Sequence, residues 1–407
     1  MEFKKYKLDD VCLKITDGSH YSPKNDENSK ISMLSVKDML TYDFNYNDCK
    51  HISEEEYNKM KRNDCVPKIG DVLVAKDGSY LKEIFVNKRD NKKAILSSIA
   101  IFRPNTSIIL PEYLCYLLKS PKVYNYTRNN CVSGSALPRI ILKSFKNIPI
   151  EITTIEDQTK IVNFLSNLDK KIQLNTQINN NLFKISKMYF KQLYKNSKNW
   201  NRCKIEDLGV YISDYVANGS FKSLADNVKI YNHKEYALFI RNTDLKVNFT
   251  QERKYVDKHS YEFMRKSQLF GRELIISNVG DVGSVFLCPS YEYPMSLGNN
   301  VIMIDSKDLE TNYNYYLYFF FKSNIGQHLI DGITGGSAQP KFNKTDFRAS
   351  KISIPSIEEI EKFNKKIIPL YNKIELNVFE NETLIQLRDT LLPKFMNGEI
   401  NLDKIII

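Results

Sequence analysis

The sequence predicts an α+β protein in which two globular domains alternate with two long helices that pair as an antiparallel coiled coil. One supporting observation is a duplication. The run Gly134-Ser135-Ala136-Leu137-Pro138 returns as Gly336-Ser337-Ala338-Gln339-Pro340, 202 residues later. The other observation is that each copy is followed by a segment with the apolar spacing of a coiled coil. A unit this long, present twice, differs from a solenoid, whose repeats are about 20 to 50 residues long.

The duplication extends well beyond the motif. The same offset aligns several further pairs: Phe145 with Phe347, Ile150 with Ile352, Lys171 with Lys373, Asn175 with Asn377, and Asn179 with Asn381. Nearer the start of each half, an offset of 197 aligns Lys7-Leu8-Asp9-Asp10-Val11 with Lys204-Ile205-Glu206-Asp207-Leu208. Between these anchors the halves diverge. The chain is therefore predicted to be a pseudo-dimer that keeps its scaffold twice while the contents differ.

Composition fits a folded, basic protein. The 407 residues are 42% hydrophobic and 12% aromatic, which is ample for packed cores. Lys and Arg number 59 against 48 Asp and Glu, a net charge of +11 that favours a polyanionic partner. No apolar run is long enough to span a membrane and no signal peptide is apparent, so we expect a cytoplasmic protein. Seven scattered cysteines without C-x-x-C argue against zinc and a disulfide framework.

Each globule is expected to mix short strands with a few helices over about 150 residues. In the first half, strands are predicted at 71–75 and 94–96 and a helix at 112–118, opened by Pro111 and closed before Pro121. In the second half, strands are predicted at 274–277 and 300–304 and the matching helix at 313–322. That last helix is rich in aromatic residues, which at helical spacing belong to a core more often than to a base-stacking platform.

Two long helices follow the globules. The first is expected to begin at Thr153 or Thr154, where Glu156 and Asp157 favour the positive end of the helix dipole. Seam positions then step by alternating fours and threes: Ile161, Leu165, Leu168, Ile172, Asn175, Asn179 and Leu182, and in the second copy Phe363, Ile367, Leu370, Ile374, Asn377, Asn381 and Leu384. Uninterrupted to about Tyr194, the first helix would span roughly 55–60 Å.

Two features of these helices are open to test. Pro369 lies inside the second helix and is expected to bend or loosen it near its start. The paired asparagines fall near the middle of an antiparallel seam. They are either buried, where asparagine fixes the register, or lie wet at the edge of the seam.

Signatures of catalysis are missing. The sequence contains no P-loop, no G-x-G-x-x-G after a strand, and no Asn/Asp-Pro-Pro-Tyr/Phe quartet such as amino-methyltransferases place around a target base. The five histidines do not have metal-ligand spacing. We therefore expect no catalytic residue, no bound metal and no cofactor.

With these residues laid out, the whole chain resembles the specificity subunit of a type I DNA restriction-modification enzyme. Thr16-Asp17-Gly18-Ser19-His20-Tyr21 is similar to the family's opening turn, Gly336-Ser337-Ala338-Gln339-Pro340 to the turn before its last strands, and residues 352–359 to the start of its long helix. The second half has no equivalent opening turn, and Asn218-Gly219-Ser220 is the nearest to it. Each motif alone is weak, whereas their order and duplication are specific.

The resemblance implies target recognition domains at 1–151 and 201–353 and spacer helices at 152–200 and 354–407. It implies a non-catalytic subunit that binds double-stranded DNA together with two methyltransferase subunits and, in the full complex, restriction-translocase subunits. Each domain would read one half of a bipartite, asymmetric site, and the helices would set the unread gap. Partner subunits would then methylate adenine or cleave the DNA.

Polar residues in the turns are the candidate DNA contacts. In the first domain they are Asp17, Ser19, His20, Tyr21, Lys76, Asp77, Ser79, Tyr80, Ser133, Ser135 and Arg139. In the second domain they are Asn218, Ser220, Asn278, Ser284, Asn299, Asn300, Ser337, Gln339 and Lys341. A cation at Arg139 or Lys341 suits a phosphate or guanine, and Gln339 suits adenine. The alternative is turn chemistry, in which Gly and Ser supply tight backbone geometry whatever the function.

Two other functions stay open. A coiled-coil scaffold that organises proteins without reading DNA would have the same helices, but it would not need Arg139 or Lys341, and its associations would be insensitive to salt. An enzyme in its own right would need catalytic residues that the sequence does not show.

Overall fold

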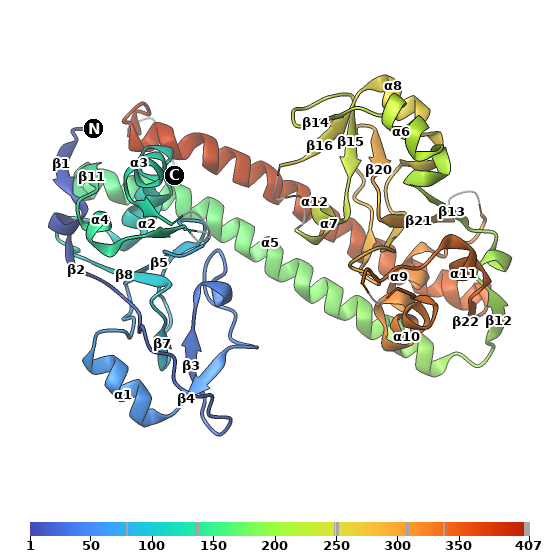
Figure 1. The fold of residues 1–407 in the computed structure, drawn as a ribbon, viewed down its shortest axis with the longest axis horizontal. Helices are drawn as coiled ribbons and strands as arrows, with labels where there is room; N and C mark the ends of the chain where they lie inside the picture. Colours follow the sequence, from blue (N-terminus) through green and yellow to red (C-terminus); the bar gives the residue numbers. More distant parts are fainter. Residues whose placement is uncertain are drawn as a thin grey trace. The chain divides into compact units, whose positions relative to one another are not determined.

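The computed structural model describes residues 1–78, 80–134, 138–247, 249, 252–306, 309–336 and 338–402 (Figure 1). By its internal contacts the chain divides into two compact units. The first comprises Met1–Gln173 with Asn381–Ile407, and the second comprises Leu174–Glu380. Each unit therefore holds one globule and one stretch of each long helix.

The first globule is built on small sheets. A four-stranded antiparallel sheet has the order β2 (Cys12–Asp17), β8 (Ile99–Pro104), β5 (Val72–Ala75) and β6 (Ile84–Val86). A second sheet orders β4 (Lys50–Ile52), β3 (Ile31–Leu34) and β7 (Lys93–Ile95), with β3 and β7 parallel. Two-stranded pairs join β1 (Lys4–Lys7) to β11 (Pro149–Ile152) and β9 (Val132–Ser133) to β10 (Arg139–Ile140). The helices are α1 (Glu54–Arg62), α2 (Pro111–Lys119), α3 (Pro121–Asn130) and α4 (Leu142–Lys146).

The second globule repeats this plan with a larger second sheet. Its four-stranded sheet has the order β13 (Tyr211–Asp214), β21 (Val301–Asp305), β18 (Leu274–Ser277) and β19 (Val285–Leu287). The other sheet orders β14 (Ile230–Tyr231), β16 (Lys254–Val256), β15 (Ala237–Ile240), β20 (Met295–Leu297) and β17 (Gln268–Leu269), and β12 (Asn201–Lys204) pairs with β22 (Lys351–Ile354). The helices are α6 (Phe221–Asn227), α7 (Asn242–Lys246), α8 (Lys258–Phe263), α9 (Asn314–Lys322), α10 (Asn324–Ile333) and α11 (Lys344–Ala349). The α+β prediction is confirmed.

The duplication is visible in individual hydrogen bonds. Gly78 N–H donates to Pro138 O at 2.9 Å, and 202 residues later Gly280 N–H donates to Pro340 O at the same distance. At the start of each half, the Lys7 and Lys204 N–H groups donate to the carboxylates of Asp10 and Asp207, both at 2.8 Å. Scaffold geometry is thus repeated where the sequence is repeated.

Each core lies between its four-stranded sheet and the long helices. In the first unit Phe102, Phe145, Ile161, Leu165 and Phe395 belong to one buried cluster. In the second unit the aromatic side chains of α9 are buried together with Phe190 and Phe363 from the long helices. The aromatic run of α9 is therefore core, as its helical spacing predicts, and offers no surface on which bases could stack.

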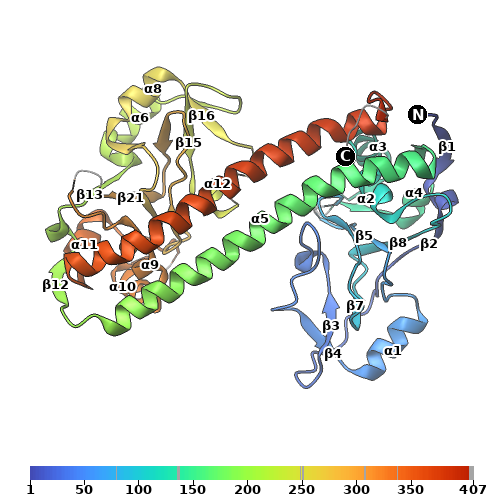
Figure 2. The ribbon, with the colours of Figure 1, turned by 180° about the vertical axis from the view of Figure 1, so that it is seen from behind.

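The long helices are α5 (Ile155–Asn196) and α12 (Ile357–Met396). In the first unit Asn381 donates to Ile172 O, and Phe395 packs on Phe164 with ring centroids 5.5 Å apart, so rising numbers on α12 meet falling numbers on α5. The antiparallel pairing holds in the second unit as well, where Asn377 meets Asn179. Figure 2 shows the two helices alongside one another. All seven predicted seam positions on each helix are buried or half-buried.

The helices differ from the prediction in one respect. α5 begins at Ile155, with Thr154 Oγ1 accepting from Asp157 N–H, and its 42 residues span about 63 Å. α12 continues through Pro369, so the proline expected to bend or loosen the helix does not interrupt it. Pro369 is exposed, so water can solvate the carbonyl that loses its helical donor.

Over the residues described, no helix combines the length and apolar character needed to cross a membrane.

Candidate functional site

One edge of each four-stranded sheet collects polar turns. β2 and β5 are both antiparallel neighbours of β8, so they run in the same direction and end at the same edge. Asp17 lies opposite Ala100, and Ala75 lies opposite Ile99. The segments that follow these two strands are therefore brought together, which the sequence alone does not specify.

A partly enclosed ion pair fixes this edge in the first unit. Lys76 Nζ donates to Asp17 Oδ2 at 2.6 Å, and the two side chains are only 9% and 14% exposed. His20 Nε2 lies 3.5 Å from the other oxygen of Asp17, but its side chain is 77% exposed. Lys76 and Asp17 thus neutralise each other, while the ring of His20 is exposed to solvent.

The hairpin β9–β10 is attached to the same edge. Ser133 pairs with Arg139, and Arg139 forms a further bridge with Asp77. Ile140 N–H donates to Lys76 O at 3.0 Å, which closes the contact. Arg139 itself is exposed, so its guanidinium is available to a phosphate or to guanine.

The remaining candidates of the first domain divide by role. Ser19 Oγ donates to Tyr21 O and accepts from Tyr21 N–H, which is turn chemistry, and it leaves the Tyr21 ring 61% exposed. Tyr80 stacks on Tyr124 with centroids 6.4 Å apart and packs against the core. Gly18 is required sterically, because a Cβ there would lie 2.2 Å from Ile95 O. Ser79 and Ser135 lie outside the described residues.

The second unit has an equivalent edge with a different ion pair. Asp214 ends β13 opposite Ile302, as Asp17 ends β2 opposite Ala100. Its carboxylate accepts from Lys344 Nζ at 2.7 Å. The position of Lys76 is taken by Asn278, whose carbonyl accepts from Phe342 N–H at 3.1 Å. The cation has therefore moved to the start of α11 while the carboxylate has stayed.

The suggested equivalence of Asn218-Gly219-Ser220 with the first opening turn is wrong. Asn218 donates to Ser267 Oγ and accepts from Lys266 N–H, both at 2.8 Å, so it holds two segments of its own globule. Ser220 caps α6 by accepting from Ser223 N–H. The residue in the place of Asp17 is Asp214, and an offset of 197 already aligns the two in the sequence.

A second polar cluster surrounds Asp281 on the same edge. Lys246 and Ser284 both contact its Oδ2 at 2.6 Å, and Asn242 lies 3.4 Å from it. Burial opposes ionisation of Asp281, but the hydrogen bonds from Lys246, Ser284 and Asn242 outweigh it and lower the pKa of this carboxyl. Asp281 is therefore an ionised carboxylate whose charge is paired within the cluster by Lys246.

The other candidates of the second domain are solvent-facing. Lys341 forms a backbone bridge with Val279. The side chains of Lys341, Asn299, Asn300 and Gln339 are exposed. Asn300 adopts φ 65°, a left-handed conformation that asparagine tolerates well. Ser337 lies outside the described residues. The prediction missed four residues of this edge: Asp214, Asn242, Asp281 and Lys344.

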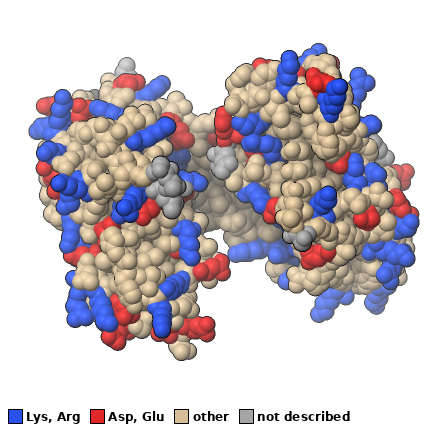
Figure 3. All heavy atoms as spheres, in the orientation of Figure 1, with Lys and Arg blue, Asp and Glu red and all other residues tan. Residues whose placement is uncertain are grey.

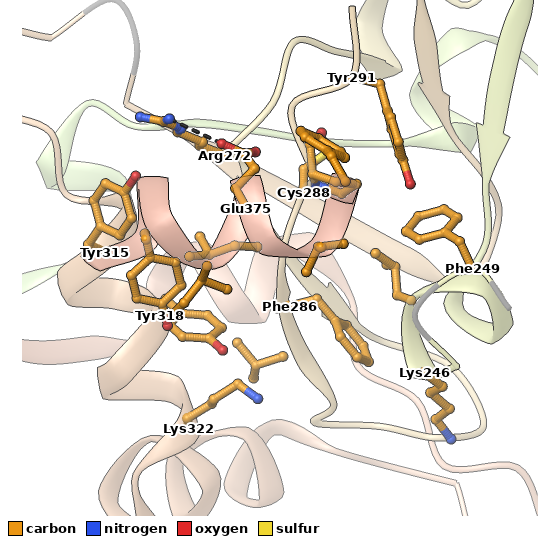
Figure 4. Close-up of a pocket in the computed structure, with 18 residues that line it drawn as sticks. Lys246, Phe249, Arg272, Phe286, Cys288, Tyr291, Tyr315, Tyr318, Lys322 and Glu375 are labelled. Carbon is orange, nitrogen blue, oxygen red and sulfur yellow. Dashed lines mark hydrogen bonds and ion pairs between the residues drawn. The ribbon is translucent and has the colours of Figure 1, made fainter. Parts of the chain in front are cut away.

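An aromatic cavity of about 360 Å³ lies where α12 packs on the second globule, and Lys246 of the Asp281 cluster is among its lining residues (Figure 4). Phe249, Phe286, Tyr318 and Tyr371 line it, and Arg272 pairs with Glu375 at 3.2 Å on one side. In the first unit, the position 202 residues before Tyr371 is Asp169, which accepts hydrogen bonds from two tyrosines and pairs with Arg388. Both regions hold a globule against the helices, one with charge and one with rings.

Basic side chains are distributed over the face of the molecule seen in Figure 3. The described part of the chain contains no group of three or more His, Cys, Asp or Glu that could hold a metal ion. The exposed candidate residues at the two edges include cations, amides and rings, which are the chemistry of groove and phosphate contacts.

Comparisons with known proteins agree on one family. The family model described as type I restriction modification DNA specificity domain matches residues 1–184 and 197–386. The type I restriction enzyme HindI specificity subunit of Haemophilus influenzae is 24% identical over 98% of this chain and 100% of its own length. The MjaIX specificity subunit of Methanocaldococcus jannaschii is 23% identical over 73% of this chain and 71% of its own. The crystal structure of a type I restriction-modification S subunit from M. genitalium superposes with a TM-score of 0.58 at 14% identity, covering 97% of this chain and 96% of that one.

Proposed function

We infer the function from the family and the geometry together: the chain belongs to the type I restriction modification DNA specificity family, and it is a DNA sequence-recognition subunit. One observation carries the inference to particular residues. The duplicated scaffold presents the same sheet edge twice, with Lys76 and Asp17 in one copy and Lys344 and Asp214 in the other. Recognition of two different base sequences requires different side chains at the protein surface that meets the bases, and a repeated scaffold can present both sets in the same geometry.

We propose that each globule reads one half of a bipartite, asymmetric site. The contacts would come from exposed side chains of each edge: Arg139, His20 and Tyr21 in the first unit, and Lys341, Gln339 and Asn299 in the second. Exposed cations suit phosphates or guanine, and an exposed amide suits adenine. The ion pairs beneath them would hold the turns rigid, because sequence discrimination needs donors and acceptors in fixed positions.

The paired helices would set the unread gap between the two half-sites. Hydrogen bonds that the seam asparagines make from one helix to the other support this role, since they resist sliding of one helix along the other. A register that cannot slip is needed if the distance between half-sites is to be constant.

The chain would contribute recognition without chemistry. Two methyltransferase subunits would modify adenine at the recognised site, and restriction-translocase subunits would join in the full complex. Recognition would take place in the cytoplasm, where bacterial DNA and these partners meet. The absence of catalytic motifs from the sequence supports this division of labour.

Exchange of residues 201–353 for the homologous domain of another specificity subunit tests the proposal. The hybrid is expected to direct methylation to a site with the first half unchanged and the second half replaced. A coiled-coil scaffold without DNA readout predicts that the modified motif stays the same after the exchange. A change in both halves would contradict the assignment of one half to each domain.

A further inference from the structure

The second half of α5 carries a row of lysines on one face. Lys184, Lys187, Lys191 and Lys195, here called the lysine stripe, are spaced by three and four residues and are all exposed. Such spacing places side chains on one side of a helix, and from the first to the last they extend over about 17 Å. Within the described residues none of the four makes an ion pair.

The duplication shows that the scaffold does not require these charges. The positions 202 residues later, on α12, are Gln386, Asp389, Pro393 and Asn397. Both helix ends occupy the same place in their repeats, yet only one is basic. The four lysines are therefore not needed for the helix to form or to pack in this fold.

The lysine stripe borders a cavity without acidic residues. The cavity has a volume of about 440 Å³ and is lined by Lys187, Lys191, Lys195 and Lys322 together with aromatic side chains. The ammonium groups of Lys187 and Lys322 lie 5.9 and 5.7 Å from the centroid of the same ring, Phe183. These two cations repel each other, and an anion bound beside them would offset that repulsion.

Burial, and then the nearby charge of Lys187, lower the pKa of Lys322. Burial acts because the ammonium loses hydration, and Lys187 acts because its positive charge repels that of Lys322. An arriving anion would remove this repulsion.

The lysine stripe is connected to the sheet edge of its own unit at which β13 and β18 end, here called the reading edge. Ser323 and Asn324, at the start of α10, line the same cavity. Gln327 of α10 donates to Gly283 O at 3.0 Å, in the turn that follows β18. The 10 residues of α10 extend about 15 Å, so phosphates four or five base pairs from the reading edge are within reach.

We propose that the lysine stripe is a sequence-independent contact with the phosphate backbone of DNA beside the second half-site. The proposal rests on the DNA-reading function proposed above and adds a surface outside the sheet edges. Its occupant is DNA because a continuous row of four cations without carboxylates matches a backbone that carries a charge at every nucleotide.

The test compares two charge-matched double variants in the complex with the methyltransferase. K187Q/K191Q removes two charges from the lysine stripe, and K365Q/K373Q removes two exposed charges from α12 in the same unit. Glutamine keeps helix propensity close to that of lysine. The probe is a 40-base-pair duplex of random sequence, and its binding constant is measured over a series of salt concentrations.

The slope of log K against log salt is expected to become shallower by about 0.9 for each lysine that neutralises a phosphate, hence by about 1.8 in K187Q/K191Q. The control should keep the wild-type slope. The methylated motif should stay the same in both variants, because phosphate contacts carry no sequence information. An unchanged slope in K187Q/K191Q would overturn the proposal.

Loss of the methyltransferase on purification, with the slope unchanged, would also overturn it, since the lysine stripe would then bind protein. Failure of the proposed function looks different. In that case the wild-type complex itself would show no split methylated motif, whatever the variants do.

Discussion

Arg388 on α12 and Asp169 on α5 form an ion pair at 2.9 Å in the first unit, and the side chains are 18% and 10% exposed. The same carboxylate accepts from Tyr116 of α2 at 2.5 Å and from Tyr42 at 2.8 Å. Three groups, one from α12 and two from the globule, thus converge on this carboxylate of α5. Burial, followed by the charge of Asp169, raises the pKa of Tyr116 well above its ordinary value, so the hydroxyl stays a donor.

Asp169→Asn should lower the free energy of unfolding by about 3 kcal/mol, because it leaves a partly buried guanidinium with only an exposed carboxylate as its counter-charge. The matched control is Asp389→Asn. Asp389 also contacts Arg388, at 2.8 Å, but is 58% exposed and should contribute less than about 1 kcal/mol. Urea denaturation of both variants makes the comparison. Equal losses would show that burial of the Asp169 pair contributes nothing.

The seam asparagines are predicted to control register at the expense of stability. Asn377 is fully buried and donates to Asn179 Oδ1 at 2.8 Å, while its own Oδ1 has no hydrogen-bond partner in the described structure. Asn377→Leu removes an unsatisfied acceptor and should leave the denaturation midpoint equal or higher. Methylation should then appear at more than one gap length. A lower midpoint with a single gap would contradict this role.

The two ion pairs at the sheet edges should act on separate half-sites. Lys76→Gln removes the partner of Asp17, and Lys344→Gln removes the partner of Asp214. Each should weaken binding of the site about tenfold by loosening one reading turn, in line with the 1–3 kcal/mol carried by a specific contact. In each variant, base substitutions in the half-site read by the altered domain should then reduce the binding affinity less than they do for the wild type. If both variants relax the same half, the assignment of edges to halves fails.

The length of the helices should determine the gap. Four residues added to α5 between Leu174 and Leu182, with four added to α12 between Leu376 and Leu384, lengthen the pair by one turn. One turn is about 6 Å, close to two base pairs, so the gap should grow by about two. Four residues inserted between α5 and β12, in the loop at 197–200, provide the control and should leave it unchanged. An unchanged gap in the lengthened protein would mean that the helices only bind partners.

The pattern of the sequence predicts the repeating parts of this protein well. Heptad spacing identifies the seam from Ile161 to Leu182, since a helix must bury one stripe whatever surrounds it. Spacing alone leaves open whether the seam asparagines are buried: Asn175 and Asn377 are, whereas Asn179 and Asn381 are half-buried, and their role in register stays a prediction. The outcome at Pro369 depended on solvent access to one carbonyl, which spacing does not encode.

The reading edges were harder to predict, because they join segments far apart in the chain. Lys76 and Asp17 are both candidates from the sequence, but their pairing depends on the order β2-β8-β5. Lys344 was not predicted because the lysine that pairs with the equivalent carboxylate in the first repeat is Lys76, at a different position of the repeat. Only the fold shows that the cation comes from another segment in the second repeat. Asp281 is acidic and internally paired, so a search for exposed polar turns does not favour it.

The measurement that tests the central claim most directly is the methylation map of a host without DNA methylation that expresses this chain with its neighbouring methyltransferase. The proposed function predicts modified adenines in one split motif with two different halves and a gap of fixed length. A complex that co-purifies intact but produces a continuous motif, a palindromic one or no methylation would contradict the reading of two half-sites by two domains.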